Sequence, residues 1–435
     1  MKSSAGRKLF TTIILLGLTV ALTFIFHLNI PNNWQLENKF ANTAAKFMLY
    51  YLLFILLRTL ALLSLSFIEF ASRKRLPYVK TFPLVTMIIP CYNEGIVVNK
   101  AIESVKKIDY PNLEILVVDD GSIDDTFDRA KELEKTDSRI RVIFQTNGGK
   151  SSALNNGISQ ANGDYFVCMD ADSILSPNLL MASIPFFEND PNLASVAGAV
   201  EVGNANNTLT LFQKLEYIIG LNFHKMAQSC LNMVTIVPGP IGVFNKQFVL
   251  DVGGYHTDTF AEDCDLSMRL LMAGHNIKYT GAITARTEAP DQVNALITQR
   301  YRWSRGMIQS IIKSVKGAAK AKSLRAVLIV VYMFAETILI PLINFTFIIL
   351  TLEFALIYET TELMGPYFIG LTLLDLTLCL YSIIMEKEIS LLFLLGLINR
   401  VTFGLGMEVI RFFSIVDEIF NIPMKWGVLS RKGMD

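Results

Sequence analysis

The chain has 435 residues, of which 52% are hydrophobic and only 18% are charged. Soluble proteins carry charge on about a quarter of their residues, so this composition excludes disordered and fibrous classes and indicates a membrane protein with a sizeable soluble part. Lys plus Arg and Asp plus Glu both number 39, and this balance does not indicate a nucleic-acid partner. The five cysteines form no C-x-x-C pair. They therefore predict neither a zinc site nor a disulfide framework, and they favour a reduced cytosolic face.

Two apolar stretches lie within the first 80 residues. Residues 9–27 approach the ~20 residues that a spanning helix needs. A signal peptide is the alternative, but no small-residue cleavage site follows, so we expect a retained membrane helix. Residues 47–70 form a second span, followed at once by the basic residues 73–75. Because basic residues flank the outer ends of both helices, the positive-inside rule places the N-terminus and everything after Lys80 in the cytoplasm.

From residue 81 to about residue 325, no stretch is long and apolar enough to span a membrane. Short β-branched runs alternate here with charged segments of helical character. The predicted strands are 85–90, 113–118, 140–144 and 165–169, and the predicted helices among them are 94–107 and 124–135. This alternation implies a mostly parallel sheet with helices on both faces. Ligands of such sheets bind outside the carboxyl ends of the strands, where the acidic clusters of this chain lie.

The last third of the chain is apolar again. Residues 326–358, 367–385 and 389–413 are candidate spans, and the first of them contains Pro341. It is too short for two full spans, so it predicts one span with an interfacial stretch or a helix broken at Pro341. Five spans in total would leave the C-terminus outside, whereas the basic tail 425–432 favours the cytoplasm. The number of C-terminal spans stays open.

Asp170 and Asp172 follow the strand predicted at 165–169. Two carboxylates at positions i and i+2, where a strand turns into a loop, can face one divalent cation, and Mg²⁺ and Mn²⁺ prefer such oxygen ligands. A turn or a helix cap is the alternative, because Asp is common in both.

A second acidic cluster, Asp119 and Asp120, ends another predicted strand and precedes Gly121. These carboxylates can accept hydrogen bonds from a base or a ribose, and the glycine lets the backbone approach closely. A simple Asp/Gly/Ser turn is the alternative. Lys150 follows the loop 147–149, and a cation on such a loop suits a diphosphate, with a solvated lysine as the alternative.

Three carboxylates, Glu262, Asp263 and Asp265, precede the helical run 266–272. Acidic residues are favoured at helix N-termini, so capping alone could explain them. The functional alternative is that one of them is a general base.

Gln299 and Trp303 are four residues apart and share one face of a predicted helix that also carries Arg302. This combination suits a diphosphate leaving group and an aromatic platform for a sugar. An amphipathic helix on the membrane surface is the alternative, and both interpretations can hold together.

Taken in chain order, these segments resemble the processive membrane glycosyltransferases of family 2, a group that includes cellulose, hyaluronan, chitooligosaccharide and poly-N-acetylglucosamine synthases. Five stretches carry the resemblance: 89–94 (IPCYNE), 118–122 (VDDGS), 149–155 (GKSSALN), 170–172 (DAD) and 299–303 (QRYRW). The segment 238–242 (PGPIG) also fits the part that shapes the acceptor side. Any one of them is a weak signal, but five in order with spans at both ends are specific. One position departs from the pattern, since Ala261 stands where many relatives have Thr before Glu-Asp.

The resemblance implies a GT-A-like fold: an α/β nucleotide-sugar-binding domain on the cytosolic side, inserted between N-terminal and C-terminal transmembrane helices. We expect membrane helices and a basic linker at 1–80, and the glycosyltransferase domain at 81–294. Amphipathic interface helices with the QRYRW motif follow at 295–325, and a transmembrane channel region at 326–435.

The resemblance also implies roles on the donor side. Asp119 or Asp120 holds the uridine, and Tyr92 and Glu94 line the nucleotide pocket. Lys150 lies near the diphosphate. Asp172, with Asp170 beside it, coordinates Mg²⁺ or Mn²⁺.

For catalysis and the acceptor, the resemblance makes Asp263, with Glu262 beside it, the catalytic pair, and it adds two residues to the donor side. Asp263 takes the proton from the acceptor hydroxyl in one inverting displacement. Gln299 and Arg302 bind the leaving diphosphate. Trp303 and the segment around Gly239 bind the acceptor sugar.

The function implied is a processive β-glycosyltransferase that polymerises a sugar from UDP-N-acetylglucosamine or UDP-glucose and exports the product. Its partners are the UDP-sugar, the growing polysaccharide and the lipid bilayer, with a small accessory membrane subunit as a further candidate. We expect a multi-pass protein of the plasma (inner) membrane with a cytoplasmic catalytic domain. The alternatives are transfer of one sugar to a polyprenyl phosphate or other lipid, and a transporter or scaffold with a degenerate domain.

Overall fold

The computed structural model describes residues 39–72, 79–356, 361–386 and 392–424. The described chain forms two compact units. One contains the described residues up to Ser64 together with Ile340–Val409, and the other contains Leu65–Leu339 and the described residues from Ile410 onward. The predicted membrane helix at 9–27, the basic residues 73–75 and the tail from 425 lie outside the described residues.

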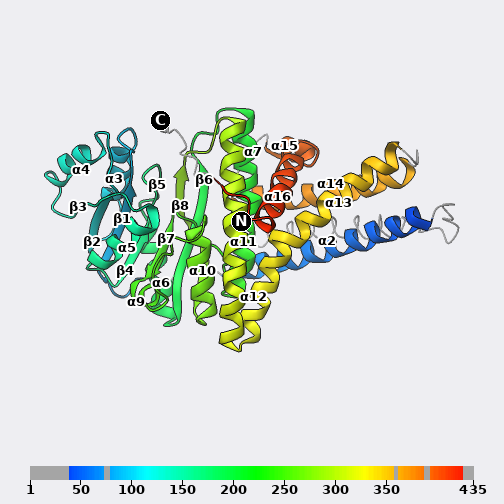
Figure 1. Ribbon diagram of the computed structural model, residues 1–435. Helices are drawn as coiled ribbons and strands as arrows, with labels where there is room; N and C mark the ends of the chain where they lie inside the picture. Colours follow the sequence, from blue (N-terminus) through cyan, green and yellow to red (C-terminus); the bar gives the residue numbers. More distant parts are fainter. Residues whose placement is uncertain (1–38, 73–78, 357–360, 387–391, 425–435) are drawn as a thin grey trace. The chain divides into compact units, whose positions relative to one another are not determined.

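The second unit is built on an eight-stranded sheet with the order β3-β2-β1-β4-β7-β6-β8-β5 (Figure 1). Its strands are β1 (Val85–Cys91), β2 (Leu113–Asp119), β3 (Ile140–Phe144), β4 (Tyr165–Cys168), β5 (Ile174–Leu175), β6 (Leu193–Val202), β7 (Gly242–Asn245) and β8 (Asn276–Thr287). The four strands predicted from the sequence are present within two residues of their predicted ends.

The sheet is mixed rather than uniformly parallel. The strands from β3 to β4 pair in parallel, as predicted. Strand β7 lies between β4 and β6 and runs antiparallel to both. Strand β8 pairs in parallel with β6, while the short β5 pairs antiparallel with β8.

Helices cover both faces of the parallel half of the sheet. Successive side chains of a strand point to opposite faces, so a strand that is apolar throughout needs a covering layer on each face. Val85, Met87 and Ile89 of β1 share one apolar core with helices α3 (Val98–Lys106) and α6 (Leu179–Asn189). On the opposite face, Ile88 lies against Gly157 of α5 (Lys150–Gln160).

Two predicted helices are shorter than expected at their N-terminal ends. Helix α3 begins at Val98 rather than residue 94, because Glu94 to Val97 form a separate hydrogen-bonded turn. Helix α4 (Thr126–Glu134) begins after Asp124, whose carboxylate accepts the Thr126 N–H at 3.0 Å. An acceptor at this place satisfies one backbone donor that a helix N-terminus leaves without an intrahelical partner.

Seven further helical segments lie between residues 208 and 334. They are α7 (Thr208–Glu216), the π-helical turn η1 (Tyr217–Phe223), α8 (His224–Cys230), α9 (Lys246–Asp251), α10 (Glu262–Met272), α11 (Val293–Ala321) and α12 (Leu324–Phe334). The predicted interface region 295–325 therefore consists mainly of one long helix, α11, which packs against α10.

Among the described residues, three helical segments are long and apolar enough to span a membrane: Lys46–Ser72, Leu324–Glu353 and Ile369–Glu386. They lie in α2 (Lys39–Ser72), in α12 continuing into α13 (Ile340–Leu356), and in α14 (Thr361–Glu386). Helices α15 (Leu392–Asn399) and α16 (Phe403–Ile419) would form a fourth span, bent by 53°. These elements agree with the spans predicted at 47–70, 326–358, 367–385 and 389–413.

The helix around Pro341 is continuous rather than broken. A π-helical turn, η2 (Ala335–Leu339), immediately precedes Pro341 and joins α12 to α13. A proline ring displaces the carbonyl four residues earlier and removes a backbone donor. A π-turn at this place accommodates the displaced carbonyl without ending the helix.

Candidate active site

The loops after β1 and β2 are joined by hydrogen bonds. The Asn93 N–H donates to Ser122 Oγ at 2.9 Å, and the Ile123 N–H donates to Asn93 Oδ1 at 2.9 Å. Tyr92 is exposed at 41% beside this joint, and the Glu94 N–H donates to Thr126 Oγ1. The predicted nucleotide residues Tyr92 and Glu94 thus lie in the loop that faces the end of β2.

The two carboxylates at the end of β2 have different surroundings. Asp119 Oδ1 accepts the N–H groups of Gly121 and Ser122 at 3.1 and 2.9 Å. Its Oδ2 is buried without a hydrogen-bond partner among the described residues. Because a buried acceptor without a partner costs free energy, this oxygen is suited to a donor group on a ligand.

Asp120 instead binds the glycine loop before α5. Its Oδ1 accepts the Gly148 N–H at 2.9 Å and the Gln145 amide at 2.7 Å, and its Oδ2 accepts the Gly149 N–H at 2.8 Å. Gly149 has a φ of +85°, which favours glycine. Asp120 therefore orders the turn that presents Lys150.

Lys150 is the first residue of α5, and its ammonium group joins two predicted site residues. Lys150 Nζ lies 2.6 Å from Asp170 Oδ1 and 3.1 Å from Glu262 Oε1. Burial alone would lower the pKa of Lys150, but Asp170 and Glu262 raise it above its ordinary value. A Cβ at Gly239 would lie 2.9 Å from Lys150 Nζ and 3.3 Å from Asp170 Oδ2, so Gly239 lies against the same pair.

Asp172 is more buried than Asp170, with 6% of its surface exposed. Its Oδ1 accepts the hydroxyls of Ser173 at 3.2 Å and of Thr287, at the end of β8, at 3.4 Å. In the part of the chain that the structure describes, no three His, Cys, Asp or Glu side chains form a group able to hold a metal ion. A cation at this place would therefore take its remaining ligands from a substrate or water.

Glu262 and Asp263 open α10. Burial raises the pKa of Asp263 to about 6, and the Glu262 carboxylate adds to that rise, while Lys150 and Arg302 oppose it. The Cys264 N–H donates to Asp263 Oδ1 at 2.7 Å. A carboxylate with this pKa is ionised at neutral pH and is a better proton acceptor than an exposed aspartate.

Helix α11 carries Gln299, Arg302 and Trp303, and it also carries a charge pair that the sequence did not reveal. Arg300 binds Glu216 of α7 through two guanidinium nitrogens, with Nη2 2.6 Å from Oε2. The guanidinium carbon lies 4.2 Å from the centre of the Trp303 ring, and Arg300 also donates to Gln299 Oε1. Arg300 thus fixes the two predicted ligand-binding side chains on either side of it.

Helices α10 and α11 meet with their backbones almost in contact. A Cβ at Gly306 would lie 2.4 Å from the Ala261 N atom and 2.5 Å from its Cβ. Arg302 Nη1 donates to the carbonyl of Phe260 at 3.1 Å. The short side chain of Ala261, the position that departs from the family pattern, therefore faces the glycine that follows the QRYRW motif.

A series of contacts connects the predicted site residues. Asp120 holds the loop of Lys150, Lys150 pairs with Asp170 and Glu262, and Arg302 contacts the segment before Glu262.

Sequence reasoning missed Arg300, Glu216 and Gly306. Arg300 and Gly306 lie in or next to the QRYRW motif, but Glu216 is 84 positions away and no local pattern marks it.

The arrangement of strands and helices defines a class of protein. The chain is similar to a mannosyltransferase from Pyrobaculum calidifontis, whose structure was solved in complex with GDP-Man and Mn²⁺. The TM-score is 0.52 at 16% identity, covering 84% of this chain and 99% of that one. The second unit therefore has the GT-A-like glycosyltransferase fold that the sequence predicted.

Residues 86–250 match the family described as glycosyl transferase family 2. The chain is 32% identical over 238 residues to a poly-β-1,6-N-acetyl-D-glucosamine synthase of Staphylococcus aureus, and 30% identical over 240 residues to that of Staphylococcus epidermidis. The matches cover 55% of this chain and 58% of each relative, so the chain spans less than two thirds of their length. The resemblance to family 2 polysaccharide synthases is confirmed.

The contact at Gly306 yields a prediction about stability. Gly306→Ala should lower the melting temperature by several degrees, because the new methyl group overlaps Ala261 and must force α10 and α11 apart at a cost of about 1–3 kcal/mol. Thermal unfolding in detergent measures this change.

Gly317→Ala on the same helix is the matched control. Its Cβ would meet the flexible side chain of Met272 at 3.1 Å rather than backbone, and alanine has the higher helix propensity. Equal destabilisation by both substitutions would contradict a specific contact at Gly306.

Proposed function

We propose that the chain is a processive inverting β-glycosyltransferase that polymerises a sugar from a UDP-sugar and moves the product across the membrane. The observation that carries this proposal is the position of Asp263. Its neighbour Glu262 pairs with Lys150, which also pairs with Asp170. Asp263 itself interacts electrostatically with Lys150 and with Arg302 of the QRYRW helix. Lys150 and Arg302, the cations proposed to bind the diphosphate, both act on this one carboxylate and lower its pKa against the effect of burial.

On the donor side, the free oxygen of Asp119 would accept a hydrogen bond from the uridine, and Tyr92 would lie beside the base. We assign the uridine to Asp119 rather than Asp120, because Asp120 already uses both oxygens to hold the glycine loop. Lys150 would contact the diphosphate. UDP-N-acetylglucosamine is the first donor to test, since the curated relatives are N-acetyl-D-glucosamine polymer synthases.

Asp170 and Asp172 would hold Mg²⁺ or Mn²⁺ together with diphosphate oxygens. Their carboxylate oxygens at the end of β4 suit such ions, and Asp170 already binds the cationic Lys150. The similar mannosyltransferase contains Mn²⁺ with its nucleotide sugar, which supports this assignment. When bound, the cation would offset the negative charge that develops on the leaving diphosphate.

Asp263 would act as the general base. The acceptor hydroxyl gives its proton to the Asp263 carboxylate while its oxygen forms a bond to the anomeric carbon. The bond from that carbon to the diphosphate breaks on the opposite face, UDP leaves with the electron pair, and the configuration inverts. Arg302 and Gln299 would bind the leaving group, and Trp303 would support the acceptor sugar.

The apolar helices provide the reason to expect export. A polar glycan needs a protein-lined path through ~30 Å of hydrocarbon, and α2, α12 to α14 and the α15–α16 pair are candidates to form it. We place the glycosyltransferase domain in the cytoplasm, where UDP-sugars are made. Transfer of one sugar to a lipid phosphate is the alternative, and a glycolipid in place of a polymer ladder would establish it.

The role of Asp263 predicts that Asp263→Asn lowers turnover by at least ~10²-fold, because the amide cannot accept the proton. UDP affinity should change little, since the amide keeps the size of the side chain. UDP release and radiolabelled polymer, measured on purified protein with each UDP-sugar in turn, test this. Retained turnover would move the base to Glu262.

The pKa of Asp263 predicts a pH dependence. Only the carboxylate form can take the proton, so kcat/KM should rise with pH through a midpoint near pH 6 and fall about tenfold per unit below it. Initial rates of UDP release between pH 5 and 8 measure this limb. A midpoint near pH 4, the ordinary range of an exposed aspartate, would contradict the buried position.

The metal assignment predicts that Asp172→Asn raises the Mn²⁺ concentration needed for half-maximal UDP binding by about tenfold or more. Asp164→Asn is the matched control, because Asp164 is exposed just before β4, at the opposite end of the strand. Calorimetric titration of UDP at several Mn²⁺ concentrations measures both variants. Superimposable curves for Asp172→Asn and the unmodified protein would refute the assignment.

A further inference from the structure

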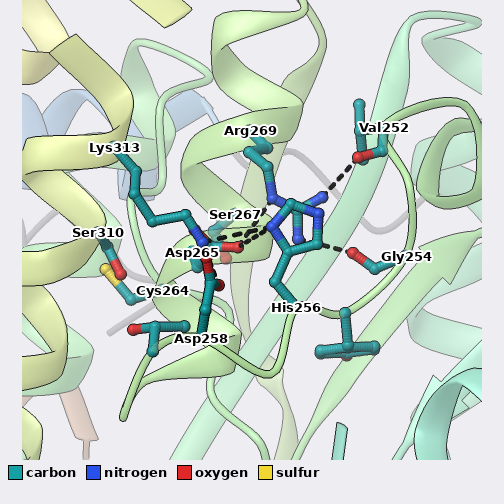
Figure 2. Close-up of polar contacts among 12 residues, drawn as sticks. Val252, Gly254, His256, Asp258, Cys264, Asp265, Ser267, Arg269, Ser310 and Lys313 are labelled. Carbon is teal, nitrogen blue, oxygen red and sulfur yellow. Dashed lines mark hydrogen bonds and ion pairs between the residues drawn. The ribbon is translucent and has the colours of Figure 1, made fainter. Parts of the chain in front are cut away.

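Helix α10 carries a second acidic side chain, Asp265, that the proposed reaction does not use. It lies two residues after Asp263, and its side chain is only 1% exposed. Figure 2 shows that Asp265 is surrounded by Arg269, Lys313 and His256, which reach it from three different segments. A buried carboxylate requires such partners, because desolvation disfavours its charge.

Both oxygens of Asp265 are occupied by cationic groups. Oδ1 lies 2.8 Å from Lys313 Nζ, and Oδ2 lies 2.8 Å from Arg269 Nε and 3.5 Å from His256 Nδ1. Neither oxygen is then left to face a substrate hydroxyl. Of the three acidic residues at the start of α10, Asp265 is therefore not a candidate for the general base.

The cations that bind Asp265 connect α10 to its neighbours. Arg269 donates to the carbonyls of Val252 and Gly254, both at 2.6 Å, and so holds the loop 252–258. Lys313 belongs to α11. It follows Gln299 by about four helical turns, toward the C-terminal end of that helix. Asp265 thus links α10 to the loop through Arg269 and to α11 through Lys313 (Figure 2).

The same loop is attached to the helix that begins with Lys150. The Asn155 amide of α5 donates to the Tyr255 carbonyl at 2.7 Å, and the Tyr255 N–H donates back to Asn155 Oδ1 at 2.8 Å. The helices that present Lys150, Asp263 and Arg302 are therefore connected by one loop and one buried charge cluster.

We propose that Asp265 is a positioning residue that acts through Arg269 and Lys313 to hold Asp263 in its reactive position against α11. The inference rests on the proposed function, because it concerns the geometry of the same base. Loss of the Asp265 charge leaves two cations without their shared partner, so α10 and α11 separate or rotate. A displacement of about 1 Å at a reacting group can lower turnover by ~10²-fold without removing any contact to substrate.

The test compares Asp265→Asn with Asp258→Asn. Asp258 also pairs with Lys313, at 2.6 Å, but is 67% exposed, and exposed ion pairs contribute little. The two variants therefore make the same chemical change beside the same lysine. We expect Asp265→Asn to lower kcat for UDP release by about 10- to 100-fold, with KM for the UDP-sugar and UDP affinity nearly unchanged. Asp258→Asn should match the unmodified protein.

Hydrogen exchange supplies a readout that does not depend on activity. In Asp265→Asn, amide exchange should accelerate in 262–272 and 306–314, the facing parts of α10 and α11, and stay unchanged in β1 and β2. If no UDP-sugar is turned over by the unmodified protein, the proposed function fails. The exchange pattern still decides whether Asp265 holds the two helices together.

Three results would overturn the inference. They are an unchanged kcat in a folded Asp265→Asn protein, a parallel loss of UDP binding and kcat, and equal effects of Asp265→Asn and Asp258→Asn. If Asp265→Asn does not fold, Lys313→Met replaces it in the test. In Lys313→Met, Asp265 keeps Arg269 as a partner but loses its link to α11. A kcat of Lys313→Met equal to that of the unmodified protein would then refute the positioning role.

Discussion

The ammonium group of Lys150 is the charge on which the arrangement of the site depends. It lies within ion-pair distance of Asp170, which follows β4, and of Glu262, which opens α10. Without a cation there, carboxylates from two separate elements would repel one another in a partly buried space. Lys150 also lowers the pKa of Asp263, against the effect of burial. One side chain therefore stabilises the contact between the end of β4 and the start of α10, and it helps to keep the proposed base ionised near neutral pH.

The parts of the fold that follow from local pattern were predictable from the sequence. Short β-branched runs marked β1 to β4, because buried parallel strands need continuous apolar stretches. The acidic residues that end β2 and begin α10 were visible as motifs. The apolar runs corresponding to α2 and α14 were visible as candidate spans. In each case the signal and the structure that it specifies occupy the same few residues.

The remaining features depend on contacts between distant segments. Strand β7 is four residues long, and its antiparallel placement between β4 and β6 is decided by pairing rather than by its own sequence. The pair of Arg300 with Glu216 joins positions 84 apart. The motif around Asp119 and Asp120 could not show that one carboxylate holds a loop while the other keeps an oxygen available. That distinction required the positions of the Gly148 and Gly149 N–H groups.

The hydrogen bonds of Asp120 have a thermodynamic consequence. Fixing the backbone of a residue costs about 1–2 kcal/mol in conformational entropy, and glycine loses the most freedom. Because Asp120 already holds Gly148 and Gly149, that cost is met during folding rather than when a ligand arrives. If Lys150 binds a diphosphate as proposed, little further ordering of the turn before it would then be needed on binding. One buried carboxylate thus gives a fixed conformation to a turn that its glycine content would otherwise leave flexible.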